Sequence, residues 1–209
     1  MNPIQHQNDS VFKRVLLLYG AYMFLNNSAY LIGYYLLPEG TLRGSPQTVA
    51  GQIADSAGSF GMELALTLAF NLGLAALLAV LLNLNQVNGF PTGYVYPLFL
   101  GVFGGLIAGT NSFLASDLSQ YTVWEGTALS LSIGNLEMLG YICMIAATVK
   151  LGIYQYKSWW RWTGKWKAIK TGRLRDVRLE PFEVTFLVIG IALVVFAAYR
   201  ETQMAWGLI

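Results

Sequence analysis

The sequence predicts an all-α fold: a polytopic transmembrane helical bundle of about five spans, with a cytoplasmic interfacial amphipathic helix. Charged residues make up 11% of the chain and hydrophobic residues 55%, whereas about a quarter of the residues in a soluble domain are charged. A bilayer is crossed by roughly 20 apolar residues. The chain has five apolar stretches of about this length or longer, at about 15–37, 61–84, 92–114, 131–153 and 182–199. They are continuous, unlike the alternating strands of a β-barrel. We therefore expect one transmembrane domain over residues 1–209.

The first predicted span, 15–37, follows Lys13 and Arg14 and contains no charged residue. It is longer than the about 7–15 apolar residues of a signal peptide, and no small-residue cleavage site closes it. We therefore expect an uncleaved signal anchor. Asn26 and Asn27 lie near its middle, where an amide side chain usually makes a hydrogen bond to another helix.

The second predicted span carries a single carboxyl group, Glu63, near its start. At helical spacing, Glu63, Thr67, Asn71 and Leu74 form one predicted stripe. An ionised carboxylate in hydrocarbon is costly, so it turns inward, takes up a proton or pairs. A structural role and a functional role are both open for Glu63.

The third predicted span contains Gly101, Gly105 and Gly109, two overlapping small-xxx-small registers. Glycines at this spacing let a neighbouring backbone approach closely. We expect this helix to be central and to face protein, either within the chain or in another subunit. Asn111 lies late in the same span and is a candidate for an interhelical hydrogen bond or a partner contact.

The fourth predicted span begins with Asn135 and Glu137, and Tyr141 follows one turn later on the face of Glu137. The same structural and functional alternatives apply to Glu137. Cys143, the only cysteine, lies in this span, which excludes an intramolecular disulfide and favours a packing role.

The distribution of charge predicts the orientation. The loops at 39–59 and after 114 carry more acidic than basic residues, whereas nine of the 13 Lys and Arg residues lie between Lys150 and Arg178. Basic residues near span ends stay in the cytoplasm. We expect the cell (cytoplasmic or inner) membrane, a cytoplasmic N-terminus and an external C-terminus.

The basic segment 156–178 is predicted to be an amphipathic helix. One face carries Trp159, Trp162, Trp166 and Ile169, and another carries Lys157, Arg161 and Lys165. Such a helix lies flat among lipid headgroups, so anionic lipids are predicted partners and nucleic acid is not. It could serve only to anchor the topology or could dock a cytoplasmic protein.

Residues typical of enzyme and metal sites are scarce. The single histidine, His6, precedes the first span, so histidine-ligated haem and histidine metal sites are not expected. The chain also lacks a nucleotide-binding loop and an evident nucleophile–base pair. We expect no catalysis, no metal and no cofactor other than bound lipid.

Two segments resemble a known family. They contain Asn71 before an apolar run, then Asn88-Gly89-x-x-x-Gly93, and later Gly134-Asn135-x-Glu137 followed by Ala146-Ala147 and Gly152. Over about 60–155 the chain is similar to the SpoIIM family of membrane proteins (stage II sporulation protein M and relatives). The resemblance implies a non-enzymatic component of a larger assembly. Asn135 stands where the family has a histidine, and Glu137 is retained.

Three functions are compatible with these observations. The first is a non-catalytic subunit that packs with other membrane proteins, as a hetero- or homo-oligomer. The second is a small permease or proton-coupled carrier, which would require Glu63 and Glu137 to face a common water-filled cavity. The third is a lipid- or pigment-binding accessory subunit of an energy-converting complex, favoured by the 14% aromatic content.

Overall fold

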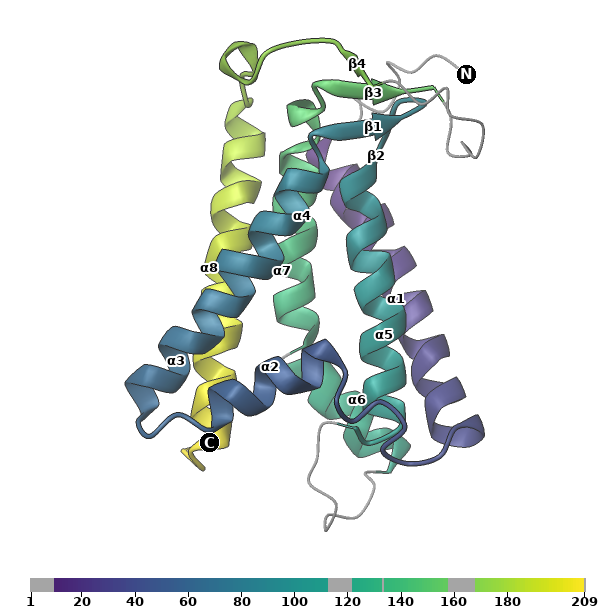
Figure 1. The fold of residues 1–209 in the computed structure, drawn as a ribbon, viewed down its shortest axis with the longest axis vertical. Coiled ribbons are helices and arrows are strands. Elements are labelled where there is room, and N and C mark those ends of the chain that lie inside the picture. The colour runs from purple at the N-terminus through teal and green to yellow at the C-terminus, as the bar shows by residue number, and fades with distance from the viewer. Residues whose placement is uncertain (1–9, 113–121, 133, 158–167, 209) are drawn as a thin grey trace.

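The computed structural model describes residues 10–112, 122–132, 134–157 and 168–208 and is mostly helical (Figure 1). Within these described residues, four helical segments are long and apolar enough to cross a membrane: Val11–Leu36 (α1), Phe60–Leu82, Thr92–Gly109 and Pro181–Ala205 (α8). They correspond to the first, second, third and fifth predicted spans. The prediction of a mainly helical fold with several candidate membrane spans is confirmed.

The fourth predicted span, 131–153, is not one long helix. It is divided between α6 (Val123–Ser132) and α7 (Gly134–Ala147), and a 3₁₀ turn, η3 (Val149–Leu151), follows. The 14 residues of α7 extend about 21 Å, less than the roughly 30 Å of a hydrocarbon core. The predicted bounds were wrong at the C-terminal end, because the chain beyond Ala147 turns and enters a strand that pairs with a distant segment; whether α7 crosses the membrane stays a prediction.

A four-stranded sheet covers one end of the bundle, which we call the sheet end (Figure 1). Its order is β2-β1-β3-β4, formed by β1 (Asn85–Val87), β2 (Phe90–Pro91), β3 (Tyr154–Tyr156) and β4 (Ile169–Lys170). Asn88 and Gly89 join β1 to β2, both at positive φ, as a type I′ hairpin turn requires. Because β3 pairs with both β1 and β4, the sheet ties together two connections far apart in sequence.

The predicted amphipathic helix over 156–178 is wrong for the described part of that segment. β4 and a 3₁₀ turn, η4 (Leu174–Asp176), lie there, because the backbone of β4 pairs with β3 rather than with its own next turn. Lys157 is exposed directly after β3. Residues 158–167 of the predicted helix lie outside the described residues, and they include Trp159, Arg161, Trp162, Lys165 and Trp166.

The helices form two closely packed pairs, α1 with α5 (Val95–Gly109) and α7 with α8 (Figure 1). The pairs meet through a core that includes Val15, Tyr22 and Ile142, and they spread apart toward the end opposite the sheet (Figure 1). There α2 (Pro46–Asp55) lies across the bundle. Since α1 begins at the sheet end and α8 ends at the opposite end, the chain runs between the two ends an odd number of times.

Glycines allow both helix pairs to pack closely. A Cβ on Gly105 would overlap the carbonyl oxygen of Asn26, and one on Gly101 would lie 2.8 Å from the ring of Tyr22, so α5 has no room for side chains there. Gly109 likewise abuts the backbone of α1. Gly140 and Gly190 play the same part between α7 and α8, because a Cβ on either would come within 2.8 Å of the other's carbonyl oxygen.

The second span consists of α3 (Phe60–Leu68), the π-helix η1 (Ala69–Ala76) and α4 (Leu77–Leu82). The i→i+5 bonds of a π-helix accommodate an extra residue relative to an α-helix. Glu63 and Thr67 are buried, but Leu74 is 63% exposed, so the predicted stripe is wrong at Leu74. Beyond the π-helix the buried positions are Ala76, Ala79 and Asn83. The π-helix thereby turns Asn83 toward α7.

Candidate functional site

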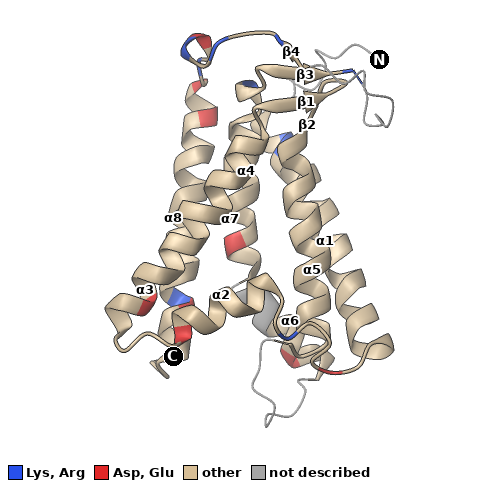
Figure 2. Ribbon diagram, in the orientation of Figure 1, with Lys and Arg blue, Asp and Glu red and all other residues tan. Residues whose placement is uncertain are grey.

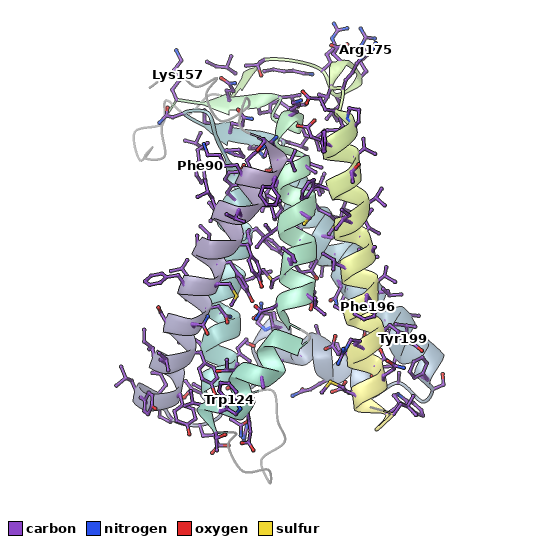
Figure 3. The ribbon with its side chains drawn as sticks, turned by 180° about the vertical axis from the view of Figure 1, so that it is seen from behind. Phe90, Trp124, Lys157, Arg175, Phe196 and Tyr199 are labelled. Carbon is purple, nitrogen blue, oxygen red and sulfur yellow. The ribbon has the colours of Figure 1, made fainter. Side chains whose placement is uncertain are left out.

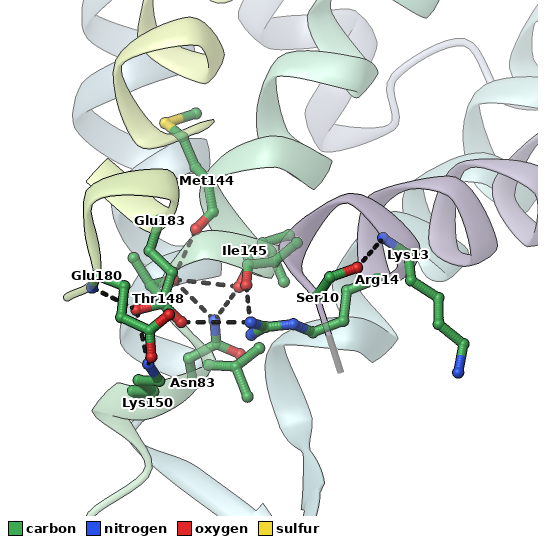
Figure 4. Close-up of polar contacts among 12 residues, drawn as sticks. Ser10, Lys13, Arg14, Asn83, Met144, Ile145, Thr148, Lys150, Glu180 and Glu183 are labelled. Carbon is green, nitrogen blue, oxygen red and sulfur yellow. Dashed lines mark hydrogen bonds and ion pairs between the residues drawn. The ribbon is translucent and has the colours of Figure 1, made fainter. Parts of the chain in front are cut away.

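The C-terminal end of α7 lies inside the protein, and residues 140–149 are all buried. The last four carbonyl groups of a helix lack intrahelical partners, and here water cannot supply them. Side chains from other elements reach two of them: Asn83 Nδ2 donates to Ile145 O over 2.8 Å, and Arg14 Nη1 donates to Ala146 O over 2.8 Å. Just beyond α7, Gln86 Nε2 donates to Val149 O of η3 over 3.3 Å. Asn83 also donates to the hydroxyl of Thr148 over 2.9 Å (Figure 4).

Arg14 and Glu183 form a buried ion pair at this point, with 3.3 Å between Nη2 and Oε1 and exposed side-chain fractions of 6% and 1%. A buried charge requires such a partner. The helix dipoles favour both charges, because the arginine lies at the C-terminus of α7 and the carboxylate in the first turn of α8. Glu183 also accepts a hydrogen bond from the backbone N–H of Glu180 over 2.8 Å, which completes a capping box.

Lys150 joins the same group from η3. Its Nζ lies 2.6 Å from Glu180 Oε1 and 3.1 Å from Glu183 Oε2. Burial lowers the pKa of Lys150, but the hydrogen bonds and charges of the two glutamates outweigh burial, so the pKa is raised above its ordinary value. The hydrogen bond from Lys150 lowers the pKa of Glu180.

We call this group the sheet-end cluster; its members are Arg14, Asn83, Gln86, Thr148, Lys150, Glu180 and Glu183. Ser10 caps α1 by accepting a hydrogen bond from the Lys13 N–H, so Arg14 lies one turn into the helix on its buried face with Val11 and Val15. The positive charges of the two cations balance the negative charges of the two carboxylates. The side chains of Arg14, Asn83 and Gln86 donate hydrogen bonds to backbone carbonyls. The arrangement can hold α1, α4, α7 and α8 together, but it offers no nucleophile paired with a base.

Two glycines of the family-like segments make room for this cluster. A Cβ on Gly93 would overlap the amide of Asn83, and one on Gly152 would overlap the amide of Gln86. Asn88 and Gly89 form the hairpin turn of the sheet. These motif residues therefore lie around the end of α7.

Glu137 marks a second polar group, in the first turn of α7. The hydroxyl of Tyr141 donates to its carboxylate over 2.5 Å. Glu137 is half-buried.

Glu63 lies near the opposite end and is 3% exposed. Its carboxylate accepts a hydrogen bond from the indole N–H of Trp206 over 2.6 Å, which links α3 to the end of α8. Phe60 packs edge-on against both Trp206 and Tyr199.

The asparagines differ in their roles. Asn26 donates to the carbonyl of Gly101 over 3.0 Å, an interhelical bond of the predicted kind. Asn27 instead bonds to Met23 of its own helix, so its predicted interhelical bond is wrong. Asn111 lies beyond the end of α5, at φ 52°, and donates to Glu39 over 2.7 Å; the prediction that it lies within the span is also wrong.

Two further candidates have no such bond in the described part of the structure. Asn71 is half-buried in the π-helix. Asn135 is 5% exposed, and its Oδ1 has no hydrogen-bond partner among the described residues.

Sequence reasoning missed most of the sheet-end cluster. Arg14 was interpreted only as a charge flanking a span, and no role was predicted for Asn83 or Gln86. The only signal for Glu183 was local: Glu180, Pro181 and Glu183 have the spacing of a capped helix start. That spacing predicts the capping box but not the arginine that reaches it from α1.

Among the described residues, no group of three or more His, Cys, Asp or Glu side chains is placed to hold a metal ion.

Comparison of the chain with protein-family models, curated proteins and solved structures finds no match.

Proposed function

We propose that this chain is a non-catalytic, multi-pass subunit of a larger membrane complex. The observation that carries the proposal is how its polar side chains within the bundle are used. Arg14 pairs with Glu183, and Glu63 bonds to Trp206. Asn26 bonds to the α5 backbone. These groups join helices of this chain to one another, which is a structural use of polarity in a membrane.

The helix faces directed away from the bundle are apolar and available to partner helices or lipid. Exposed side chains include Phe24 on α1, Phe99 on α5 and Phe196 on α8; Phe196 and Tyr199 point outward from α8 (Figure 3). A partner subunit would cover one of these faces, and lipid the others.

Photo-crosslinking in intact membranes tests the proposal. A photoreactive residue replaces Phe24, Phe99 or Phe196, one at a time, and the adducts are identified by mass. We expect one face to yield a discrete protein adduct and the others to yield lipid adducts. Trp124 at the opposite end, 80% exposed, serves as a control outside the helix faces. Lipid adducts at all three faces, together with a protein that purifies alone in mild detergent, would contradict the proposal.

We further propose that the sheet end faces the cytoplasm, that the N-terminus is cytoplasmic and the C-terminus external, and that α7 is a fifth, protein-enclosed crossing. Lys and Arg residues gather at the sheet end (Figure 2), which supports this orientation. The resemblance to the SpoIIM family implies the same kind of role in an assembly.

A proton-coupled carrier is the second candidate, and one observation favours it: two carboxyl side chains, Glu63 and Glu137, are buried or half-buried within helices of the bundle. Proteoliposomes that hold a pH-sensitive dye test it, with Glu137→Gln as the inactive variant and Glu180→Gln as the control. Proton flux that is lost only in Glu137→Gln would favour the carrier. Equal, background-level flux in all three samples would favour the subunit.

A further inference from the structure

A short stretch beside the sheet combines exposed apolar and cationic side chains. We call residues 168–178 the cationic strip. Its exposed cations are Lys170, Arg173, Arg175 and Arg178. Ile169 and Leu174 stand among them, 45% and 52% exposed. Asp176 is the strip's one acidic residue and lies 3.7 Å from Arg175.

The position of the strip relates it to the membrane. α8 begins at Pro181, and its second residue, Phe182, is 76% exposed although the helix is apolar enough to span a bilayer. The apolar surface of α8 thus begins four residues after Arg178. Arg175 lies at the sheet end beyond the start of α8, and Lys157 lies across the sheet from it (Figure 3). The strip is therefore held at the depth where headgroups meet hydrocarbon.

We propose that the cationic strip binds anionic phospholipid headgroups in the leaflet at the sheet end, with Leu174 and Ile169 inserted between the lipids. Both kinds of side chain in the strip suit a phospholipid. Arginine pairs with phosphate through two parallel hydrogen bonds, and apolar side chains at this depth enter the boundary of the acyl chains. An acidic protein would satisfy the cations but would leave these two apolar side chains without an apolar environment. The inference rests on the proposed membrane placement and not on any partner subunit.

The test uses the full chain in nanodiscs, with Cys143→Ala and a fluorescent NBD label on Leu174→Cys. In phosphatidylglycerol-rich nanodiscs we expect the emission to move to shorter wavelength and to be quenched by brominated acyl chains. In phosphatidylcholine nanodiscs both effects should be much weaker. Replacing Arg173, Arg175 and Arg178 together by Gln should abolish the difference, since each cation near an anionic surface strengthens association roughly fivefold.

A label on Ile53→Cys is the matched control, because Ile53 is 47% exposed on α2 at the opposite end. Its emission should not depend on the lipid. A Leu174 label that responds equally to both lipids, or a response that survives the triple Gln replacement, would overturn the inference. Protection of Leu174 only after addition of a soluble acidic protein would also overturn it. The nanodiscs contain no partner subunit, so failure of the subunit proposal leaves this result unaffected.

Discussion

Arg14 is the residue whose surroundings explain most about the bundle. It is buried, its charge is balanced by Glu183, and it caps a carbonyl of α7. Removing one member of a buried pair leaves the other charge uncompensated, at a cost of about 3–5 kcal/mol. Arg14 and Glu183 should therefore depend strongly on each other.

A double-mutant cycle measures this dependence. Arg14→Met and Glu183→Gln should each lower the free energy of unfolding in detergent by about 3–5 kcal/mol, and the double variant should lose clearly less than the sum. Arg43→Gln is the control, because Arg43 pairs with Glu39 at 3.7 Å on the surface and exposed pairs contribute at most about 1 kcal/mol. Additive losses at Arg14 and Glu183 would show that the two residues act separately.

Glu137 gives a second prediction at this scale. Gln can still accept the hydrogen bond from Tyr141, whereas Ala leaves that hydroxyl unpaired, at a cost of about 1–3 kcal/mol. Glu137→Gln should keep the thermal stability of the protein, and Glu137→Ala should reduce it. Wild-type stability of the Ala variant would remove Glu137 from any structural role.

At the scale of elements, the packing of α1 on α5 depends on individual glycines. Gly105→Leu should lower the free energy of unfolding by about 3 kcal/mol or more, the upper end for overpacking, because a side chain there meets the backbone of α1. Gly104→Leu is the matched control, since the nearest atom to its Cβ is Asn26 Nδ2 at 3.8 Å. Equal effects in thermal unfolding would contradict this packing.

The π-helix permits a sharper test. Deleting Gly73 should convert η1 to an α-helix and turn Asn83 away from α7, so the Asn83 amide no longer donates to the Ile145 carbonyl and the Thr148 hydroxyl. We expect a loss of at least about 2 kcal/mol, measured by unfolding in detergent. Gly73→Ala, at a position with open space around the Cβ, should change stability by less than about 1 kcal/mol. A deletion as mild as Gly73→Ala would contradict the register shift.

How far the sequence predicts these elements depends on where their determinants lie. The glycine registers and apolar runs are local patterns, so four of the predicted spans correspond to helical segments in the structure. The change of helical register at η1 cannot be predicted from the sequence, because the same run of apolar residues is compatible with an α-helix and with a π-helix. The sheet and the cap of α7 were missed, because Arg14, Asn83 and Glu183 meet only after the chain has folded.

At the scale of the whole molecule, the account depends on α7. Its 14 residues are too few to reach across a bilayer alone, yet it runs between the two ends at the centre of the bundle (Figure 1). Its enclosure explains why its carbonyls are capped by side chains rather than by water. If α7 crosses the membrane, the two ends of the chain lie on opposite sides.

Cysteine accessibility in intact cells tests this topology most directly. In a Cys143→Ala background, Gln52→Cys on α2, Gly172→Cys in the cationic strip and Leu208→Cys beyond α8 are treated with a membrane-impermeant maleimide. The account predicts labelling of Gln52→Cys and Leu208→Cys in intact cells, and of Gly172→Cys only after permeabilisation. The account would be contradicted if Leu208→Cys, like Gly172→Cys, were labelled only after permeabilisation. The C-terminus and the sheet end would then lie on the same side of the membrane.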